Sequence, residues 1–305
     1  MSRFRSTVLF HSLIAALAAP ALVASLSDAE PKTTGASTPP PTIVLTGTVR
    51  DFQERGVPGG HPDFQVGSSA THGNFVHMVE TTLGPDRKPV YKGNARRVAS
   101  HWRDSANRNI CWCLYDPSKG DTVGTTNMVG PGAVKSKDSF YSWYNDDLNY
   151  NVSQPLSLTL VRGLDGNYIF DSQTDPAYQA LGGFFPIENQ LFGNMPGTHP
   201  PRNFHFTFEL HTKFTYDASA GQIFGFRGDD DVWVFIDGKL VIDLGGLHPA
   251  LEQFVDISRL GLVDGETYEL SFFFAERHRT QSNFKMTTNL QLQTLDMPTA
   301  STAFD

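Results

Sequence analysis

The sequence contains few cysteines, few charged residues and no excess of positive charge. Only two of its 305 residues are cysteines, which excludes a disulfide-rich scaffold. Charged side chains make up 18% of the chain, and 24 Lys and Arg stand against 32 Asp and Glu, for a net charge of −8. A surface that neutralises nucleic-acid phosphates or an anionic membrane needs a basic excess, so neither partner is expected.

The sequence also lacks an apolar run long enough to span a membrane. The longest run, Leu13–Val23, falls well short of the roughly 20 residues that a spanning helix needs. Arg3 and Arg5 precede this run and small residues follow it as far as Ala29, a pattern typical of a secretory signal peptide. We therefore predict a signal peptide over residues 1–29 and a secreted protein, located outside the cell or at its surface.

Composition divides the rest of the chain into three parts. Residues 30–41 are rich in Pro, Thr and Ser and predict a spacer without a core, and residues 296–305 predict a polar tail. The intervening residues 42–295 are expected to form the folded domain. Within it we expect an N-terminal strand and long loops over 42–150, followed by a β-sandwich core over 151–295.

Alternating apolar and polar residues predict strands throughout this domain. Phe alone accounts for 23 residues, and aromatic residues favour strands. The alternation is strict in Phe204–His211, so its apolar residues are expected to face a core and its polar residues to face water. Asp237 and Gly238 form a two-residue loop that predicts a type I′ hairpin. The other expected strands are Thr42–Val49, Leu156–Val161, Tyr168–Phe170, Val232–Ile236, Lys239–Leu244, Tyr268–Ala275 and Phe284–Leu292.

These strands predict an all-β fold, an antiparallel β-sandwich or Greek-key barrel with long loop insertions. The insertion between Asn74 and Lys137 is aperiodic and rich in turn residues, and it contains both cysteines, Cys111 and Cys113. No nearby histidine spacing completes a zinc site with them. Two states remain open for this pair: free buried cysteines or a strained bridge.

Three consecutive carboxylates, Asp229, Asp230 and Asp231, stand where a loop enters an apolar strand. Neighbouring like charges repel one another unless a cation lies among them. Calcium fits oxygen ligands supplied by flexible loops, because it accepts 6–8 oxygens with tolerant geometry. The spacing differs from that of an EF-hand, so any site must combine distant loops. A solvated acidic turn is the alternative interpretation.

The sequence carries no motif of a familiar enzyme class. It lacks His-Glu-x-x-His, Gly-x-Ser-x-Gly and the glycine loops that bind phosphates or dinucleotides. Three contiguous Asp residues also suit an ion better than an acid/base pair, which requires two different environments. We therefore expect a protein without enzymatic activity.

The stretch from Gly228 to His248 resembles the signature of the fibro-slime domain family. That family is itself similar to the lectin-like β-sandwich named after bacterial protective antigen. The resemblance spans roughly Thr42 to Gln293. Its further motifs are Leu45–Phe52, His61–Phe64, Phe140–Tyr144, Phe204–Phe208, Phe274–Phe284 and Thr288–Leu290.

The resemblance implies a calcium site formed by two neighbouring Asp residues joined by a cis peptide, with an Asn and backbone carbonyls from another loop. The pair maps best onto Asp229 and Asp230, with Asn283 as the partner ligand. Asp231 departs from the wider superfamily, which often has a small residue there, so Asp230 and Asp231 are the alternative pair. A turn-forming role is the alternative for Asn283.

In glycan-binding relatives, vicinal hydroxyls of a sugar complete the calcium shell. The resemblance therefore implies a carbohydrate-binding, adhesive module whose partner is an extracellular or cell-surface glycan. Gly245, Gly246 and His248 are candidates for contacting this sugar, and a role in permitting a turn is the alternative for the two glycines. A structural component of an extracellular matrix or coat, with calcium in a stabilising role, is the alternative function. Glu276–Arg279 is interpreted as a surface ion-pair cluster.

Overall fold

The computed structural model describes residues 38–67 and 72–294. The predicted signal peptide, most of the predicted spacer and the predicted polar tail lie outside these residues. Within them, no helix is both long enough and apolar enough to cross a membrane. The fold is all-β, as the sequence predicts, and every pair of adjacent strands in its sheets is antiparallel.

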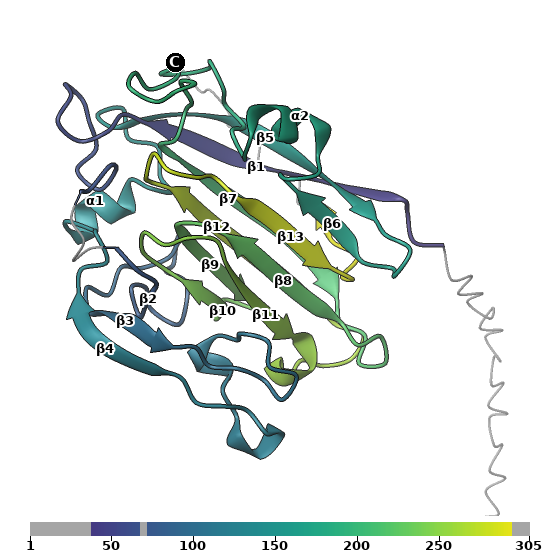
Figure 1. The fold of residues 1–305 in the computed structure, drawn as a ribbon. Helices are drawn as coiled ribbons and strands as arrows, with labels where there is room; N and C mark the ends of the chain where they lie inside the picture. Colours follow the sequence, from purple (N-terminus) through teal and green to yellow (C-terminus); the bar gives the residue numbers. More distant parts are fainter. Residues whose placement is uncertain (1–37, 68–71, 295–305) are drawn as a thin grey trace, which may run out of the picture. The chain divides into compact units, whose positions relative to one another are not determined.

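The main sheet contains eleven strands, and its path runs in the order β10-β9-β12-β7-β1-β5-β6-β13-β8-β11, with β14 paired to β7 (Figure 1). Asp243 on β10 and Gln253 on β11 exchange two hydrogen bonds, so the two ends of the path meet and the sheet nearly closes on itself. The strands are β1 Thr42–Phe52, β5 Asn151–Arg162, β6 Tyr168–Asp171, β7 Phe206–Thr215, β8 Ile223–Gly228, β9 Asp231–Ile236, β10 Lys239–Leu244, β11 Leu251–Asp256, β12 Thr267–Glu276, β13 Phe284–Thr288 and β14 Gln293–Thr294.

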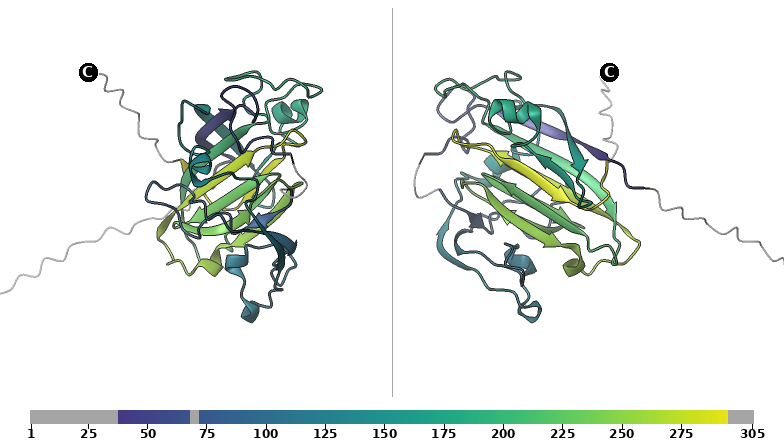
Figure 2. Two further views of the ribbon diagram at one scale, coloured as in Figure 1. Left: turned by 90° about the vertical axis from the view of Figure 1, so that its left-hand side faces the viewer. Right: turned by 45° about the vertical axis from the view of Figure 1, so that its right-hand side comes forward.

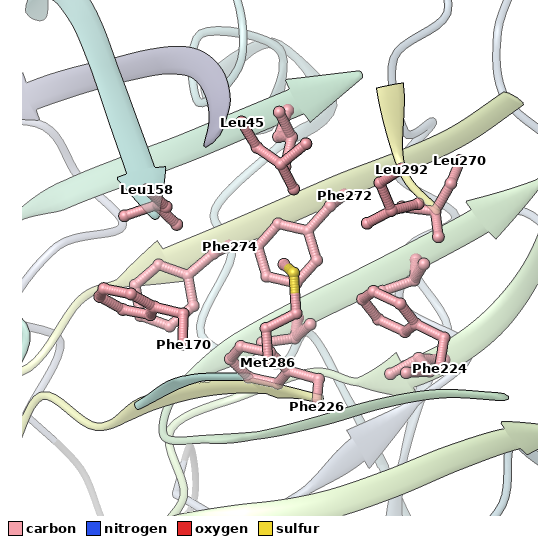
Figure 3. Packing of buried hydrophobic residues seen from close by; sticks show 14 of the residues in the cluster. Leu45, Leu158, Phe170, Phe224, Phe226, Leu270, Phe272, Phe274, Met286 and Leu292 are labelled. Carbon is pink, nitrogen blue, oxygen red and sulfur yellow. The ribbon is translucent and has the colours of Figure 1, made fainter. Parts of the chain in front are cut away.

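The larger hydrophobic core lies between the two halves of this path. Phe272 on β12 faces β8 and β13 across the core, with ring centroids 5.2 Å from Phe226 and 5.5 Å from Phe284. Figure 3 shows aromatic and aliphatic side chains from both halves converging at this point. Phe and Leu supply most of this core, and the alternation seen in the sequence identifies most of its strands. The sequence did not predict β8 and β11.

The chain between β1 and β5, residues 53–150, is called the insertion from here on, and it contains a second, smaller sheet. Its strands are β2 Phe75–Val76, β3 Ala95–Ser100 and β4 Thr125–Gly130, in the order β2-β3-β4. Figures 1 and 2 show this insertion on the outer side of the layer that contains β9 and β10. The remaining elements are the helices α1 Lys137–Tyr141 and α2 Pro176–Leu181 and the 3₁₀ turns Trp112–Leu114, Pro117–Lys119 and Ile257–Leu260.

A second hydrophobic core lies between the insertion and the main sheet. It includes Trp143 from the insertion with Trp233 and Phe273 from β9 and β12. The expectation that the polar residues of Phe204–His211 face water is therefore wrong for His205, Thr207 and Glu209, which are all buried. The insertion covers the outer face of the sheet, so polar groups on that face need partners within the protein.

Local details resolve two further expectations. Asp237 and Gly238 both have positive φ, at 52° and 69°, which confirms the type I′ hairpin between β9 and β10. Cys111 and Cys113 form a disulfide bond, which settles the alternatives that the sequence leaves open. Between them, the indole of Trp112 donates a 2.8 Å hydrogen bond to Asp243 on β10 and ties the insertion to the main sheet.

Glu209 is the hub of a buried ionic network on β7. Its carboxylate accepts a 2.9 Å hydrogen bond from Arg50 on β1 and is paired with Lys88 of the insertion and with His211. Burial alone would raise the pKa of Glu209, but the hydrogen bond with His211 and the charges of Lys88 and Arg50 outweigh it and lower the pKa to about 2. The ionised carboxylate is therefore strongly favoured in the folded state.

We predict that the protein loses stability in acid partly through Glu209. Because its pKa is lower folded than unfolded, its contribution is present above about pH 4.5 and is lost as the pH falls towards about 2. Glu209→Gln should cost about 3 to 5 kcal/mol at neutral pH, since it leaves buried cations without their partner. Urea unfolding across this pH range checks this. A difference between wild type and variant that persists undiminished at about pH 2 would contradict it.

Candidate functional site

The acidic triplet lies at the crossing between the two layers of the fold. Strand β8 ends at Gly228 and β9 begins at Asp231, so Asp229 and Asp230 alone connect them. Asp230 adopts a left-handed backbone with φ of 54°, a conformation that Asp tolerates better than most residues. Asp229 and Asp230 are only 2% and 4% exposed, so the interpretation as a solvated acidic turn is wrong.

Asp229 contacts Asn283 directly, so the structure brings together the two residues that the resemblance pairs. Its Oδ1 accepts a hydrogen bond from the backbone N of Asn283 and its Oδ2 accepts one from the Nδ2, both at 2.5 Å. The Oδ1 of Asn283 in turn accepts a 2.9 Å hydrogen bond from Gln173. Rotation of the Asn283 amide by about 180° would turn its oxygen towards Asp229, and Gln173 can accept as well as donate.

Asp231 has a different role from its two neighbours. Its Oδ2 accepts a 2.6 Å hydrogen bond from the Nε of Arg277, and its Oδ1 accepts one of 2.6 Å from the backbone N of Gly246. Asp231 thus already has a cationic partner in the buried guanidinium of Arg277, whereas Asp229 and Asp230 form no ion pair with a described residue. This difference favours Asp229 and Asp230 as the pair that could hold an ion.

Arg277 is completely buried and holds three parts of the fold together. Besides Asp231 on β9, its guanidinium donates to the carbonyls of Asp63, Gly132 and Ala133 in the insertion. It also lies 4.6 Å from the ring centroid of Trp143. The interpretation of Glu276–Arg279 as a surface ion-pair cluster is therefore wrong for Glu276 and Arg277, because the insertion covers the end of β12.

The expected cis peptide does not occur at the triplet. Among residues 38–67 and 72–294 only the bond between His199 and Pro200 is cis, so neither pair of Asp residues is joined in this way. The positive φ of Asp230 directs the side chains instead. Asp229 turns to the loop between β12 and β13, and the Oδ2 of Asp230 accepts a 2.8 Å hydrogen bond from the backbone N of Arg277.

The site concentrates negative charge in a poorly solvated volume. Burial raises the pKa of Asp229 and raises that of Asp230 well above its ordinary value, and the nearby Asp231 and Asp229 add to the shift of Asp230 while Arg277 opposes it. Burial and the nearby charges of Asp230 and Asp229 also raise the pKa of Glu276 well above its usual range. The Oε2 of Glu276 is buried without a hydrogen-bond partner among the described residues.

The donor set suits a hard cation, although its present arrangement is not that of a closed shell. Asp229, Asp230 and Asn283 offer oxygen atoms, which calcium prefers, and an ion would relieve the repulsion between the buried carboxylates. Among the residues that the structure describes, no three His, Cys, Asp or Glu side chains are already arranged to hold a metal. An ion would therefore need the Asn283 amide oxygen, backbone carbonyls or ligand oxygens to complete its coordination.

A pocket of about 440 Å³ adjoins the acidic pair. The insertion, the β10–β11 connection and the β12–β13 loop form its walls. A neighbouring pocket of about 660 Å³ includes Asn283 and shares Thr280 and Gln281 with the first, so the β12–β13 loop separates the two. The first pocket is lined by His72, Gly73, Arg97, Asp229, Asp230, Leu247, His248, Pro249, His278, Thr280 and Gln281.

The three residues considered for sugar contact have different positions. Gly245 and Gly246 lie beneath the insertion, where Gly245 exchanges two backbone hydrogen bonds with Phe75 and a Cβ at Gly246 would lie 2.5 Å from the carbonyl oxygen of Gly73. Close backbone packing thus accounts for both glycines. His248 alone of the three lines the pocket.

Apart from His248, the basic and imidazole residues that line this pocket were not singled out from the sequence. His72 and Arg97 come from the insertion, whose aperiodic sequence does not predict which face each residue occupies. The sequence did contain a signal for Arg277 and His278, because they directly follow a strongly apolar strand and therefore lie at the edge of a core. That pattern predicts that the two residues lie near the core, but it does not identify Asp231 as the partner of Arg277.

Comparisons with known proteins identify relatives of this chain. Residues 164–300 match the model of the PA14 domain, a range that includes Asp229, Asp230 and Asn283. The chain is 32% identical over 262 residues to protein psiC of Dictyostelium discoideum, covering 84% of this chain and 42% of psiC. It is 34% identical over 257 residues to protein psiD of the same organism, covering 82% and 42%. For protein psiI of that organism, the identity is 40% over 245 residues, covering 72% and 32%.

These matches show homology to the Dictyostelium psi proteins and agree with the expected protective-antigen-type domain. The chain spans less than half the length of the curated relatives it matches. The fibro-slime family is not named by them and stays a prediction. A solved GH31 α-xylosidase from Xanthomonas citri matches 79% of this chain and 22% of the enzyme at 8% identity and a TM-score of 0.25, too weak a likeness to support an argument.

Replacing Arg277 by Gln is predicted to destabilise the protein by about 3 to 5 kcal/mol, because Asp231 would remain buried without its cation. Arg162→Gln is the matched control, since Arg162 is exposed and its replacement should change the free energy of unfolding by no more than about 0.5 kcal/mol. Urea denaturation of both variants measures the difference. Equal effects of the two substitutions would show that the buried ion pair has no special importance.

Proposed function

We propose that this chain is a secreted, non-enzymatic, carbohydrate-binding and adhesion module that holds calcium and presents it to a glycan. Asp229, Asp230 and Asn283 would be the protein ligands of the ion. The observation that carries the proposal is the direct contact between Asp229 and Asn283, 54 positions apart in the sequence, at the edge of a pocket. The PA14 match over the same residues supports it.

The chemistry of the pocket fits this role. A bound calcium ion supplies open coordination positions for two neighbouring hydroxyls of a sugar. The protein positions the carboxylates through the left-handed backbone of Asp230, and the buried Arg277 fixes the segment that faces them. Both loops that would hold the ion also line the pocket, so ion binding and ligand binding would take place at adjoining surfaces.

The alternative is a structural component of an extracellular matrix or coat, in which calcium only rigidifies loops. One observation favours it: the two carboxylates are almost fully buried, and both oxygens of Asp229 accept hydrogen bonds from Asn283. In that case the ion would bind without an exposed coordination position. Calcium binding and glycan binding must therefore be measured separately.

The first prediction from this function concerns calcium alone. Calcium at a few hundred times its dissociation constant should stabilise the wild type by roughly 3 to 4 kcal/mol relative to chelator. Asp230→Asn should abolish this gain while keeping the fold, because Asn tolerates the same left-handed backbone. Thermal unfolding with calcium and with chelator checks this. Asp138→Asn, an exposed carboxylate on α1, is the matched control and should respond like the wild type.

Coincident unfolding curves of the wild type with calcium and with chelator would contradict the calcium site. A calcium response that survives in Asp230→Asn would place the ion elsewhere.

The second prediction concerns the glycan. The wild type should be retained on a glycan array in calcium and released by chelator, because sugar hydroxyls complete the shell of the ion. Asp230→Asn should lose retention, and Asp138→Asn should keep it. Stabilisation by calcium without retention on any glycan would favour the structural alternative, and retention unaffected by chelator would refute calcium dependence.

A further inference from the structure

Arg97 stands beside the acidic pair without a carboxylate partner. It lies half-buried on β3 and lines the same pocket as Asp229 and Asp230. Arg259 and Arg277 each form an ion pair, whereas Arg97 forms none with any residue that the structure describes. In a chain with an excess of acidic residues, an arginine left unpaired at a concave site indicates that its partner is an external anion.

The backbone around Arg97 is shaped to admit its side chain. Gly73 adopts φ of 132°, and a Cβ at this position would lie 2.5 Å from the Nε of Arg97. Any other residue at position 73 would therefore displace the guanidinium. Phe75 on β2 pairs with Arg97 in the small sheet, which fixes its strand against the pocket. Packing against Gly73 and pairing with Phe75 thus hold Arg97 in place within the insertion.

Other polar groups of the pocket lack partners too. The Nε2 atoms of His72 and His248 are buried without hydrogen bonds among the described residues. His248 is 6% exposed, and the ring of His72 packs edge-on against His278 with centroids 5.1 Å apart. Buried polar atoms without partners are costly, so the wall of the pocket has hydrogen-bonding capacity that the described residues leave unmet.

The charge balance of the pocket defines the class of that ligand. Among the residues that the structure describes, Asp229 and Asp230 are the only carboxylates that line it, and a calcium ion would neutralise both. The guanidinium of Arg97 would then remain as an uncompensated positive charge. A planar guanidinium binds the oxygens of a carboxylate or a sulfate with two parallel hydrogen bonds, whereas a neutral sugar would leave it without an anion.

We propose that the glycan bound at this site is acidic, and that Arg97 binds its carboxylate or sulfate group beside the ion. This inference rests on the proposed function, because it specifies the substrate class of the same pocket. It also assigns a role to the insertion, which supplies a specificity-determining residue to a site whose ion ligands lie on the sandwich.

The test uses paired glycans on one array, in calcium. Each oligogalacturonate is printed beside its methyl ester, and each sulfated galactan fragment beside its desulfated form. The wild type should bind the acidic member of a pair about ten to a hundred times more tightly, as expected for a charge-assisted hydrogen bond. A preference within the uronate pairs identifies a carboxylate ligand, and one within the sulfated pairs identifies a sulfate. Either result supports the inference.

Two neighbouring arginines provide the variant and its control. Arg97→Gln should reduce binding of the acidic glycan to the level of its neutral partner while leaving the calcium affinity measured by calorimetry unchanged. Arg96→Gln removes the same charge from an exposed position one residue away and should retain the preference. An equal loss in both variants would indicate a general effect of charge and overturn the role of Arg97.

Failure of this inference and failure of the proposed function are distinguishable. Calcium-dependent binding of equal strength to both members of every pair overturns the acidic specificity and leaves the proposed function standing. Absence of binding to every glycan, with the calcium response intact, overturns both and favours the structural alternative.

Discussion

The buried ion pair between Arg277 and Asp231 is the interaction on which the rest of the site depends. Arg277 follows β12, Asp231 begins β9, and the same guanidinium binds carbonyl groups of the insertion. Such a pair is tolerated in the interior only because nearly every donor finds an acceptor. It therefore fixes the position of the insertion relative to the strand end where Asp229 and Asp230 emerge.

The insertion changes the character of the sheet it covers. An antiparallel sheet with one solvated face would show polar residues exposed on alternate positions. Here Trp143 and its neighbours bury the outer face of β9 and β12, and polar groups such as Glu209 acquire partners from the insertion. The same covering places His72 and Arg97 at the pocket. One segment thus covers the sheet and also lines the pocket.

The lining of the pocket combines opposite charges. Asp229 and Asp230 suit a cation, whereas Arg97 suits an anion, and a calcium ion with an acidic sugar would satisfy both at once. A monosaccharide with only hydroxyl groups would satisfy the ion alone. The balance of charge in the pocket, and not resemblance to a family, thus defines the proposed class of ligand.

The sequence by itself determined the all-β class, most strands of the main sheet and the type I′ hairpin. Hydrophobic alternation and turn-forming residues act over a few positions, so strands and hairpins can be predicted from the sequence alone. Asp229 and Asn283 were linked by resemblance to a family, and their contact follows from β8 and β13 being paired neighbours.

Only the tertiary structure decided that Glu276 and Arg277 are buried, that Asp231 belongs to Arg277, and that Arg97 reaches the pocket. Each depends on where an aperiodic insertion lies in space. Local sequence carries no signal for that position, because it is set by contacts between residues far apart in the chain.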